Sequence, residues 1–386
     1  MIHRQATESF RLSRWSAFPW RSALVFAAVS VLSACASDKP KPTPLDAVSP
    51  KISGRLVWQA TVGSIGFPLG VAVRDGRFVA AGSDGTVVAI EAASGREMWR
   101  GSAGRRLSAG VGSDGRYAAV VTDGNDLVTL EAGKELWRAR LPARTVTPPL
   151  VAGERVFVMS VDRVVHAFDA IDGRRLWVLQ RNTDALTLGQ PGVLTAVGDT
   201  LIVGQGPRLT GVDPLRGTVR WEVPMASPRG SNEVERLADL VGPPIRLGNT
   251  LCLRAFQSTV GCADAARGAL LWTRNVGGAQ AAGGGAEVVA VADASDRISA
   301  YKQANGDLAW TNESLRHRSL SGFLGAGRSL VVGDFEGQVH FLDRDSGQVM
   351  LRLPTDGSPV IGAPVSSGTT LLVTTRNGGL FAFRPE

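Results

Sequence analysis

The residues able to do chemistry are few in this chain. Its 386 residues include four histidines and three cysteines, which limits metal binding and acid–base catalysis. The sequence has no His-x-x-x-His pair and no serine, histidine and aspartate set in a recognisable local context. The isolated acids Asp123, Asp126, Asp334 and Glu336 fall where hairpin turns are expected, and there a solvated turn residue is the default interpretation. The sequence therefore indicates no catalytic residue, no bound cofactor and no metal ligand.

Cys35 has a separate chemistry, because it follows an export signal. Residues 1–21 are basic, and Ser22 to Ala34 form an apolar stretch of 13 residues without a charge, too short to span a bilayer. Leu32-Ser33-Ala34-Cys35 resembles the lipobox of bacterial lipoproteins, whose cysteine carries a diacylglycerol thioether. We expect residues 1–34 to be a lipoprotein signal peptide and Cys35 to be lipidated. An ordinary signal peptide with an incidental cysteine is the alternative.

The lipobox resemblance also implies a location. The mature chain begins at Cys35 with several acyl chains, and two or more chains give stable anchoring. Ala36 follows the cysteine, whereas aspartate at this position is the usual signal for retention in the inner membrane. The resemblance thus implies the periplasmic face of the outer membrane. Residues 35–53 are rich in proline and polar residues, which predicts a lipidated, semi-extended tether.

The charge distribution argues against a nucleic-acid partner. The formal net charge of +7 falls to about +4 when residues 1–34, with four Arg and one Glu, are removed. The remaining Lys and Arg residues are scattered, without a basic run or interleaved aromatic residues that would follow a phosphate backbone. We expect no nucleic-acid binding.

Cys252 and Cys262 have the spacing of a cross-strand pair. A hairpin folded about Gln257 places them opposite each other, and directly opposed strand residues lie within disulfide reach. An oxidising periplasm permits the bond. A shift of one residue in the turn would place the thiols on opposite faces, so a pair of free buried thiols is the alternative.

A sequence repeat of about 40 residues predicts the secondary-structure elements of the chain. Seven tryptophans each follow a glycine by four positions, and an eighth copy has Gly347 with Leu351 in the tryptophan position. Within one period, residues 149–180 show four short β-branched or aromatic runs separated by turn residues. Such periods indicate a propeller. The tryptophans are Trp58, Trp99, Trp137, Trp177, Trp221, Trp272 and Trp310.

The two ends of the chain together complete the eighth copy. Residues 362–384 supply three strands, and the missing outer strand with its Gly-x-x-x-Trp is Gly54 to Trp58. Pairing of these ends removes the open edges of the ring. We predict an all-β fold over residues 54–386: an eight-bladed β-propeller of four-stranded antiparallel blades, closed by an N-terminal strand in the last blade. Each tryptophan is expected to pack against the neighbouring blade.

The Asp-x-x-x-Gly-x-x-x-Trp repeat resembles that of quinoprotein-type propellers. Together with the lipobox it resembles the BamB family, the propeller lipoproteins of the outer-membrane β-barrel assembly machinery. The segment of residues 230–244 is similar to the family's long connection between the fourth and fifth blades. This resemblance covers residues 32–386. It implies a non-enzymatic scaffold that binds BamA and other lipoproteins of the machinery and assists the assembly and insertion of β-barrel proteins.

The resemblance also implies a binding face. Connections from an outer strand to the next inner strand all emerge on one face of a propeller, so residues 181–189 and 230–244 are expected to be neighbours. In the family this face docks on a periplasmic POTRA domain of BamA through a Leu-x-Leu-Arg segment and acidic residues. By motif, Leu186, Leu188 and Asp239 match, and Arg236 adds charge beside them.

Two positions depart from the family pattern. Gly189 stands where the motif has arginine, and Val241 stands where a second aspartate is usual. These changes remove a cross-charge from the expected contact, for which Arg181 or Arg236 would have to compensate. Ordinary surface loops with a buried leucine pair are the alternative interpretation of this face.

Two other functions stay open from the sequence. A quinone-dependent periplasmic dehydrogenase shares the repeat, and by family resemblance it needs a Ca²⁺ cage, a catalytic aspartate and often adjacent cysteines. Cys252 and Cys262 are ten residues apart, and no such acidic cage can be named. A glycan-binding propeller is supported by analogy of fold alone.

Overall fold

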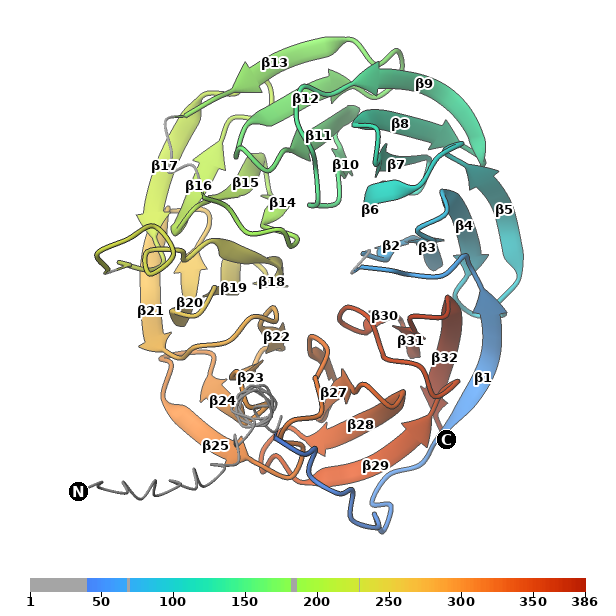
Figure 1. Cartoon of the computed structure of the whole chain (residues 1–386), viewed down its shortest axis with the longest axis vertical. Helices are drawn as coiled ribbons and strands as arrows, with labels where there is room; N and C mark the ends of the chain where they lie inside the picture. Colours follow the sequence, from blue (N-terminus) through green and yellow to red (C-terminus); the bar gives the residue numbers. More distant parts are fainter. Residues whose placement is uncertain (1–39, 68–69, 182–185, 229) are drawn as a thin grey trace, which may run out of the picture. The chain divides into compact units, whose positions relative to one another are not determined.

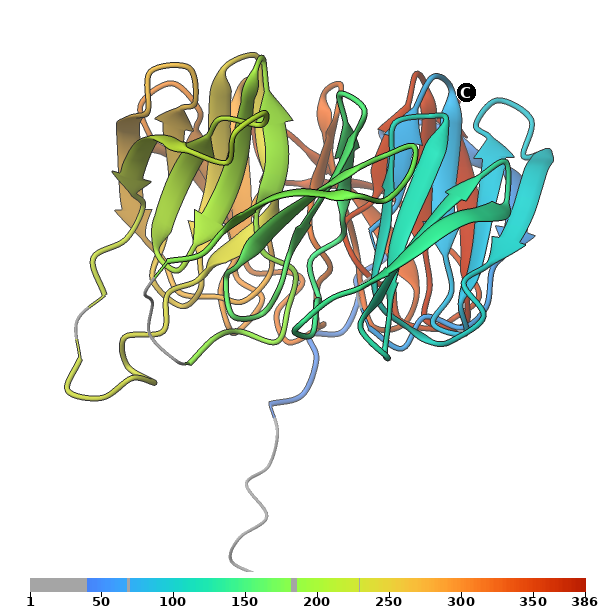
Figure 2. The ribbon, with the colours of Figure 1, turned by 90° about the horizontal axis from the view of Figure 1, so that it is seen from above.

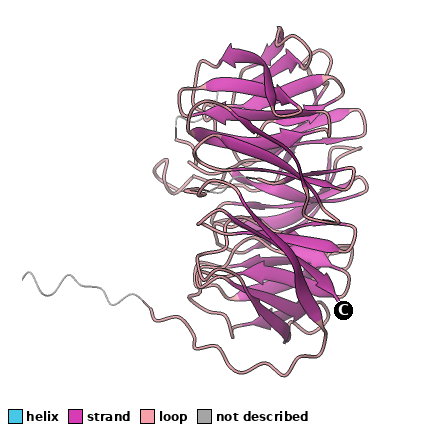
Figure 3. Ribbon diagram, turned by 90° about the vertical axis from the view of Figure 1, so that its right-hand side faces the viewer, coloured by secondary structure: helices cyan, strands magenta, loops and turns pink. Residues whose placement is uncertain are grey.

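The computed structural model describes residues 40–386 other than 68–69, 182–185 and 229. Residues 42–386 form one compact unit. The expected signal peptide and Cys35 lie outside the described residues. In the described part of this unit, the strands β1 to β32 form eight four-stranded antiparallel sheets arranged in a ring (Figures 1 and 2). The described residues contain strands, turns and loops without a helix (Figure 3). The predicted eight-bladed propeller is confirmed.

Each sheet is one blade, numbered here in chain order, with the inner strand first and the outer strand last. Blades 1 to 4 consist of β2(Ala72–Arg74), β3(Arg77–Ala81), β4(Thr86–Glu91) and β5(Glu97–Ser102); β6(Leu107–Ser113), β7(Tyr117–Thr122), β8(Asp126–Glu131) and β9(Lys134–Arg140); β10(Leu150–Ala152), β11(Arg155–Met159), β12(Val165–Asp169) and β13(Arg175–Leu179); and β14(Leu194–Val197), β15(Thr200–Gln205), β16(Arg208–Val212) and β17(Val219–Pro224).

Blades 5 to 8 follow in the same order. They consist of β18(Leu240–Leu247), β19(Thr250–Ala255), β20(Thr259–Asp264) and β21(Ala269–Asn275); β22(Gly283–Gly284), β23(Val288–Ala292), β24(Ile298–Lys302) and β25(Leu308–Asn312); β26(Leu324–Ala326), β27(Ser329–Gly333), β28(Gln338–Asp343) and β29(Val349–Pro354); and β30(Val365–Ser367), β31(Thr370–Thr374) and β32(Gly379–Pro385) with β1(Gly54–Thr61).

The middle strands of each blade carry the core. In blade 3, β11 and β12 are almost continuously buried, whereas the outer strand β13 alternates between exposed and partly buried residues. A middle strand is covered on both faces by the neighbouring blades, so it needs an unbroken apolar run rather than strict alternation. This explains why the sequence shows short runs such as Val156-Phe157-Val158 in every period.

The last blade is closed by the first strand, as predicted. Strand β1 pairs antiparallel with β32, from Gly54 opposite Pro385 to Thr61 opposite Gly379. Figure 1 shows β1 completing the outer edge of the sheet that contains β30, β31 and β32. The ring therefore has no open seam.

Each tryptophan of the repeat joins its blade to the next one. The ring lies on the glycine of the following repeat: a β-carbon at Gly347 would lie 2.4 Å from Trp310, and one at Gly306 would lie 2.5 Å from Trp272. Seven of these glycines have φ between +63° and +82°, which favours glycine. The indole Nε1 donates to the carbonyl three residues before the glycine, at 2.7–3.0 Å, from Trp58 to Ala92, Trp137 to Ala170, Trp177 to Pro214, Trp272 to Gln303 and Trp310 to Arg344.

Residues 42–53, here called the strap, are bound to blades 6 and 7. The sequence predicts that these residues are part of a tether. In the structure the Thr43 N–H donates to the Arg316 carbonyl at 3.0 Å, and the Lys51 N–H donates to the Met350 carbonyl at 3.0 Å. Arg352 donates to the Asp46 carbonyl at 3.0 Å, and Leu45 packs on the core of blades 6 and 7.

A buried charged cluster lies beneath the strap. The sequence places Asp334 in a solvated turn, but its side chain is 0% exposed and accepts hydrogen bonds from Arg318 at 2.8 Å and His340 at 3.0 Å. Arg318 also contacts Glu336 and donates to the Thr43 carbonyl at 3.1 Å. The solvated-turn interpretation of Asp334 is therefore wrong, because these donors replace the water that a buried carboxylate loses.

The hydrogen bonds define the protonation state of this cluster. Arg352 Nε donates to His340 Nδ1 at 3.3 Å, so Nε2 carries the ring proton and donates it to Asp334. Burial lowers the pKa of His340 despite the adjacent carboxylate. Burial alone would raise the pKa of Asp334, but hydrogen bonds from His340, Gln338 and Arg318 outweigh it and lower that pKa.

We expect the folded protein to lose stability as the pH falls below about 6.5. His340 and His166 are both buried with lowered pKa values, so the unfolded chain binds protons that the native protein does not. Each such proton costs up to about 1.4 kcal/mol per pH unit below the ordinary histidine pKa. Thermal unfolding followed at several values between pH 5 and 8 measures the slope. His340→Gln, which retains one donor and one acceptor, is expected to reduce it; an unchanged slope in this variant would contradict the assignment.

Candidate partner-binding face

The two segments expected to bind a partner lie on one face of the ring. Residues 181–189 lie within the connection from β13 to β14 (180–193), and residues 225–239 connect β17 to β18. Both are connections from an outer strand to the next inner strand. Figure 2 shows the connection from β17 to β18 extending from the lower side of the propeller. The predicted topology of this face is confirmed by the strand order within each blade.

Asp239 joins the two segments. One carboxylate oxygen accepts from Arg163 at 2.6 Å, and the other accepts from the backbone N–H of Leu188 at 2.8 Å. The same Arg163 donates to the carbonyl of Leu186 at 3.0 Å. The side chains of Arg163 and Asp239 are 10% and 14% exposed. The Asp239 carboxylate, which the family resemblance assigns to partner binding, thus makes hydrogen bonds within the protein. These bonds fix the backbone of the segment that carries Leu186 and Leu188.

Sequence reasoning missed Arg163. It lies in the tight turn between β11 and β12 with φ of +62°, and 76 residues separate it from Asp239. A basic residue in a hairpin turn is usually solvated, so no local signal distinguishes it. Its backbone carbonyl also accepts from the buried Gln205 side chain at 3.0 Å, which fixes this turn against blade 4.

Leu186 and Leu188 are both partly buried. Leu188 lines a small cavity together with Met159 and Leu240. The two side chains are therefore neither fully solvated nor part of the core. Their backbone is held by Arg163 and Asp239, so the leucines are presented from a fixed segment rather than from a free loop.

The tip of the longer connection folds on itself. The Glu235 carboxylate accepts from the backbone of Ser231 at 2.7 Å and from the side chain of Asn232 at 3.0 Å; these hydrogen bonds lower the pKa of Glu235, with the Ser231 backbone contributing most. Arg236 is partly exposed and donates to the Gly230 carbonyl at 3.4 Å. Val234 is 72% exposed at this tip. The tip offers a mixed apolar and charged surface.

The two departures from the family pattern have different structural settings. Gly189 is exposed, and a β-carbon there would have no atom within 4 Å. Val241 is buried in β18 opposite Arg254. Arg181, a candidate for compensating charge, already pairs with Glu222. Space for an arginine therefore exists at position 189, whereas an acidic residue at position 241 would have to be buried.

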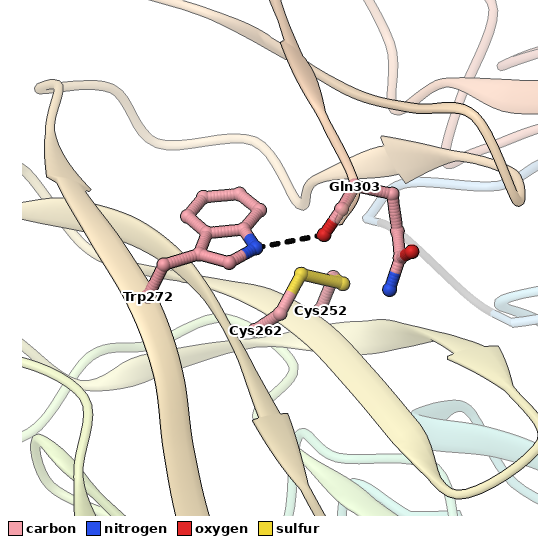
Figure 4. Close-up of a disulfide and its surroundings, with 4 residues drawn as sticks. All are labelled: Cys252, Cys262, Trp272 and Gln303. Atoms are coloured by element: carbon pink, nitrogen blue, oxygen red, sulfur yellow. Dashed lines mark hydrogen bonds between the residues drawn. A yellow bond between two sulfur atoms is a disulfide. The ribbon is translucent and has the colours of Figure 1, made fainter. Parts of the chain in front are cut away.

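Cys252 and Cys262 lie opposite each other in β19 and β20. Their sulfurs are bonded in the structure, with a Cα–Cα distance of 4.0 Å. Figure 4 shows this disulfide beside Trp272, whose indole donates to the Gln303 carbonyl of blade 6 at 2.8 Å. The register of the hairpin is the one that places both thiols on the same face. Formation of the bond in the exported protein stays a prediction.

Among residues 40–386, outside the segments that the structure does not describe, no group of three or more His, Cys, Asp or Glu side chains is placed to hold a metal ion. In the same residues no helix has the length and apolar character needed to cross a membrane. Apart from the disulfide, the site is a surface built by loops.

Fold and repeat together define an eight-bladed propeller of the quinoprotein type, in which tryptophan and glycine join successive blades. A family model described as outer membrane protein assembly factor BamB matches residues 44–105, 83–312 and 294–386. The chain belongs to this BamB family, as the resemblance of its sequence motifs predicts.

Individual relatives agree with this assignment. The chain is 38% identical to outer membrane protein assembly factor BamB of Burkholderia pseudomallei over 370 residues, covering 93% of this chain and 96% of the relative. It is 36% identical to the protein of the same name from Bordetella pertussis over 375 residues, covering 95% and 97%.

Solved structures add a comparison of folds. The crystal structure of BamB from Moraxella catarrhalis matches with a TM-score of 0.77 and 20% identity, covering 86% of this chain and all of that one. Quinohemoprotein alcohol dehydrogenase from Comamonas testosteroni matches with a TM-score of 0.63 and 15% identity, covering 86% and 76%. At these identities both matches describe the fold alone.

Proposed function

We propose that this chain is a non-enzymatic scaffold of outer-membrane protein assembly, which binds BamA and assists the insertion of β-barrel proteins. Membership of the BamB family carries this proposal. The chain aligns with nearly the whole length of relatives that are named outer membrane protein assembly factor BamB. The loop face supports it, since a fixed apolar segment bordered by polar residues is the arrangement of a protein-binding surface.

The proposed contact has Leu186 and Leu188 as its apolar anchors. The backbone that carries them is fixed by Arg163 and Asp239, so little conformational entropy is lost when a partner binds. Arg236 lies on the longer connection and adds charge near this surface. The partner is a periplasmic POTRA domain of BamA, and other lipoproteins of the assembly machinery are further partners.

Membrane attachment through Cys35 is part of the same proposal. A diacylglycerol thioether on Cys35 would hold the chain at the periplasmic face of the outer membrane, where BamA is inserted. The lipobox sequence Leu32-Ser33-Ala34-Cys35 supports this location.

Leu186→Asp combined with Leu188→Asp is expected to weaken capture of purified BamA by roughly 30-fold or more. The estimate follows from a loss of about 2 kcal/mol for one interface anchor. Binding isotherms with immobilised BamA periplasmic domains measure the change, and circular dichroism checks that the variant is folded.

The matched control carries the same charge change elsewhere. Ile171 and Leu215 are 58% and 63% exposed in the turns between β12 and β13 and between β16 and β17, on the opposite face. Ile171→Asp with Leu215→Asp is expected to bind BamA as the native chain does. Equal binding by both double variants would overturn the proposed face, and a lack of BamA binding by the folded native chain would overturn the proposed function.

A further inference from the structure

One of the eight contacts between blades lacks a tryptophan. Leu351 occupies the tryptophan position of blade 7, and its partner in blade 8 is Gly54. A β-carbon at Gly54 would lie 3.3 Å from Leu351 Cδ2, so the leucine takes the usual place of the ring. A leucine is smaller than an indole and is not planar. The seam between blades 7 and 8 is therefore filled differently from the other contacts.

A cavity of about 400 Å³ lies at this seam. Both Gly54 and Leu351 line it, so it is located where the other blades place an indole against a glycine. Its volume exceeds the roughly 150 Å³ of an engineered apolar cavity that binds benzene in another protein. The seam thus has room for a ring in addition to the leucine.

The wall of the cavity favours an aromatic ring. Phe341 and Phe383 contribute to it from blades 7 and 8, together with Leu371, and aromatic rings pack well against each other at an offset or an angle. Arg384 also lines the cavity, but its guanidinium does not face the seam. It donates to Thr370 at 2.8 Å and to the backbone of Ala92 and Ala93 in blade 1. The preference for a ring therefore comes from the apolar side chains of the wall.

We propose that the seam between blades 7 and 8 is a binding site for a small planar aromatic molecule of about the size of indole. The molecule lies beside Leu351, in the space that this smaller side chain leaves at the contact. This site is separate from the loop face proposed for BamA, because its lining includes the turns at Gly327 and Gly368 that connect inner strands to their neighbours. These turns lie on the opposite face.

The test uses indole as the probe and calorimetric titration of the full mature chain as the measurement. We expect one site per chain and a melting temperature that rises with indole concentration. Leu351→Trp fills the cavity with the chain's own indole, so it is expected to reduce indole affinity at least tenfold. The converse variant, Trp310→Leu, copies the seam to the contact between blades 6 and 7 and is expected to create a second site.

A measurement on the native chain keeps the test independent of these variants. Methyl resonances of Leu351 and Leu371 are expected to shift on addition of indole, and cyclohexanol is expected to bind at least tenfold more weakly. Equal indole affinity in the folded Leu351→Trp variant, unshifted methyl resonances, or equal affinity for cyclohexanol would each overturn the proposal. None of these results depends on BamA.

Discussion

Asp239→Ala is expected to lower the free energy of unfolding by about 3 kcal/mol. The substitution removes the carboxylate that accepts from the largely buried Arg163 at 2.6 Å, and breaking one side of a buried ion pair typically costs about 3–5 kcal/mol. The lower end applies because both side chains retain slight exposure, 10% and 14%. The Leu188 N–H loses its acceptor as well. Urea unfolding followed by circular dichroism measures the change.

Two further variants test the origin of this loss. Arg163→Met combined with Asp239→Ala completes a double-mutant cycle, and the losses of the two single variants are expected not to add because the residues are in direct contact. Asp199→Ala breaks the pair with Arg220, in which Asp199 is 86% exposed, and its unfolding midpoint is expected to remain close to that of the native chain. If Asp239→Ala unfolds like the Asp199 variant, the ion pair does not hold the two segments together.

Asp239→Ala also distinguishes two requirements for BamA binding: the leucine side chains that make the contact, and the fixed backbone that positions them. In Asp239→Ala the leucines are unchanged, but their backbone is no longer fixed to the longer connection. On our proposal BamA binding weakens in this variant even though no anchor has been removed.

Trp272→Ala is expected to have the other large effect, a loss of about 3–5 kcal/mol of unfolding free energy. The ring is 6% exposed and lies on Gly306 of the next blade. Its removal opens a cavity between blades 5 and 6 and leaves the Gln303 carbonyl without the indole N–H. Denaturant unfolding at fixed pH, with the disulfide state held constant, measures the loss.

The natural seam provides the comparison for this variant. Trp272→Leu reproduces the leucine that blade 7 already has at position 351, so it is expected to cost less than Trp272→Ala because more apolar volume remains. A loss below about 1 kcal/mol for Trp272→Ala would show that the indole contributes little to the joint between blades.

Most of the fold was predictable because the repeat recurs eight times, with tryptophan at the contact between blades in seven of the copies. Glycine, tryptophan and the preceding carboxylate recur at fixed spacing, and the structure shows why: Asp213, for example, accepts from the backbone N–H groups of Leu215 and Arg216 in the turn. The closing strand was predictable from the number of strands in the last repeat. Residues 362–384 supply three strands, so the fourth strand of that blade has to come from the N-terminal part of the chain.

The details that depend on single, unrepeated pairs were not predictable. Arg163 and Asp239 are 76 residues apart. Arg318 lies in the connection from β25 to β26, whereas its partner Asp334 lies in the turn between β27 and β28. Neither pair leaves a periodic signal. The strap was missed for a similar reason: a proline-rich segment without a strand pattern is held by arginine side chains that bond its carbonyls, as Arg352 does with Asp46.

Closure of the ring by β1 and β32 has a consequence for biogenesis. A chain synthesised from its N-terminus presents β1 first, and its partner β32 is the last of the described strands. The other seven blades can therefore complete their hydrogen bonding first, and the edge of β1 stays unpaired until β32 is available. Truncation after Gly378, which removes β32 (Gly379–Pro385) together with Glu386, would leave β1 without its partner and expose strand edges, the kind of species that chaperones and proteases recognise.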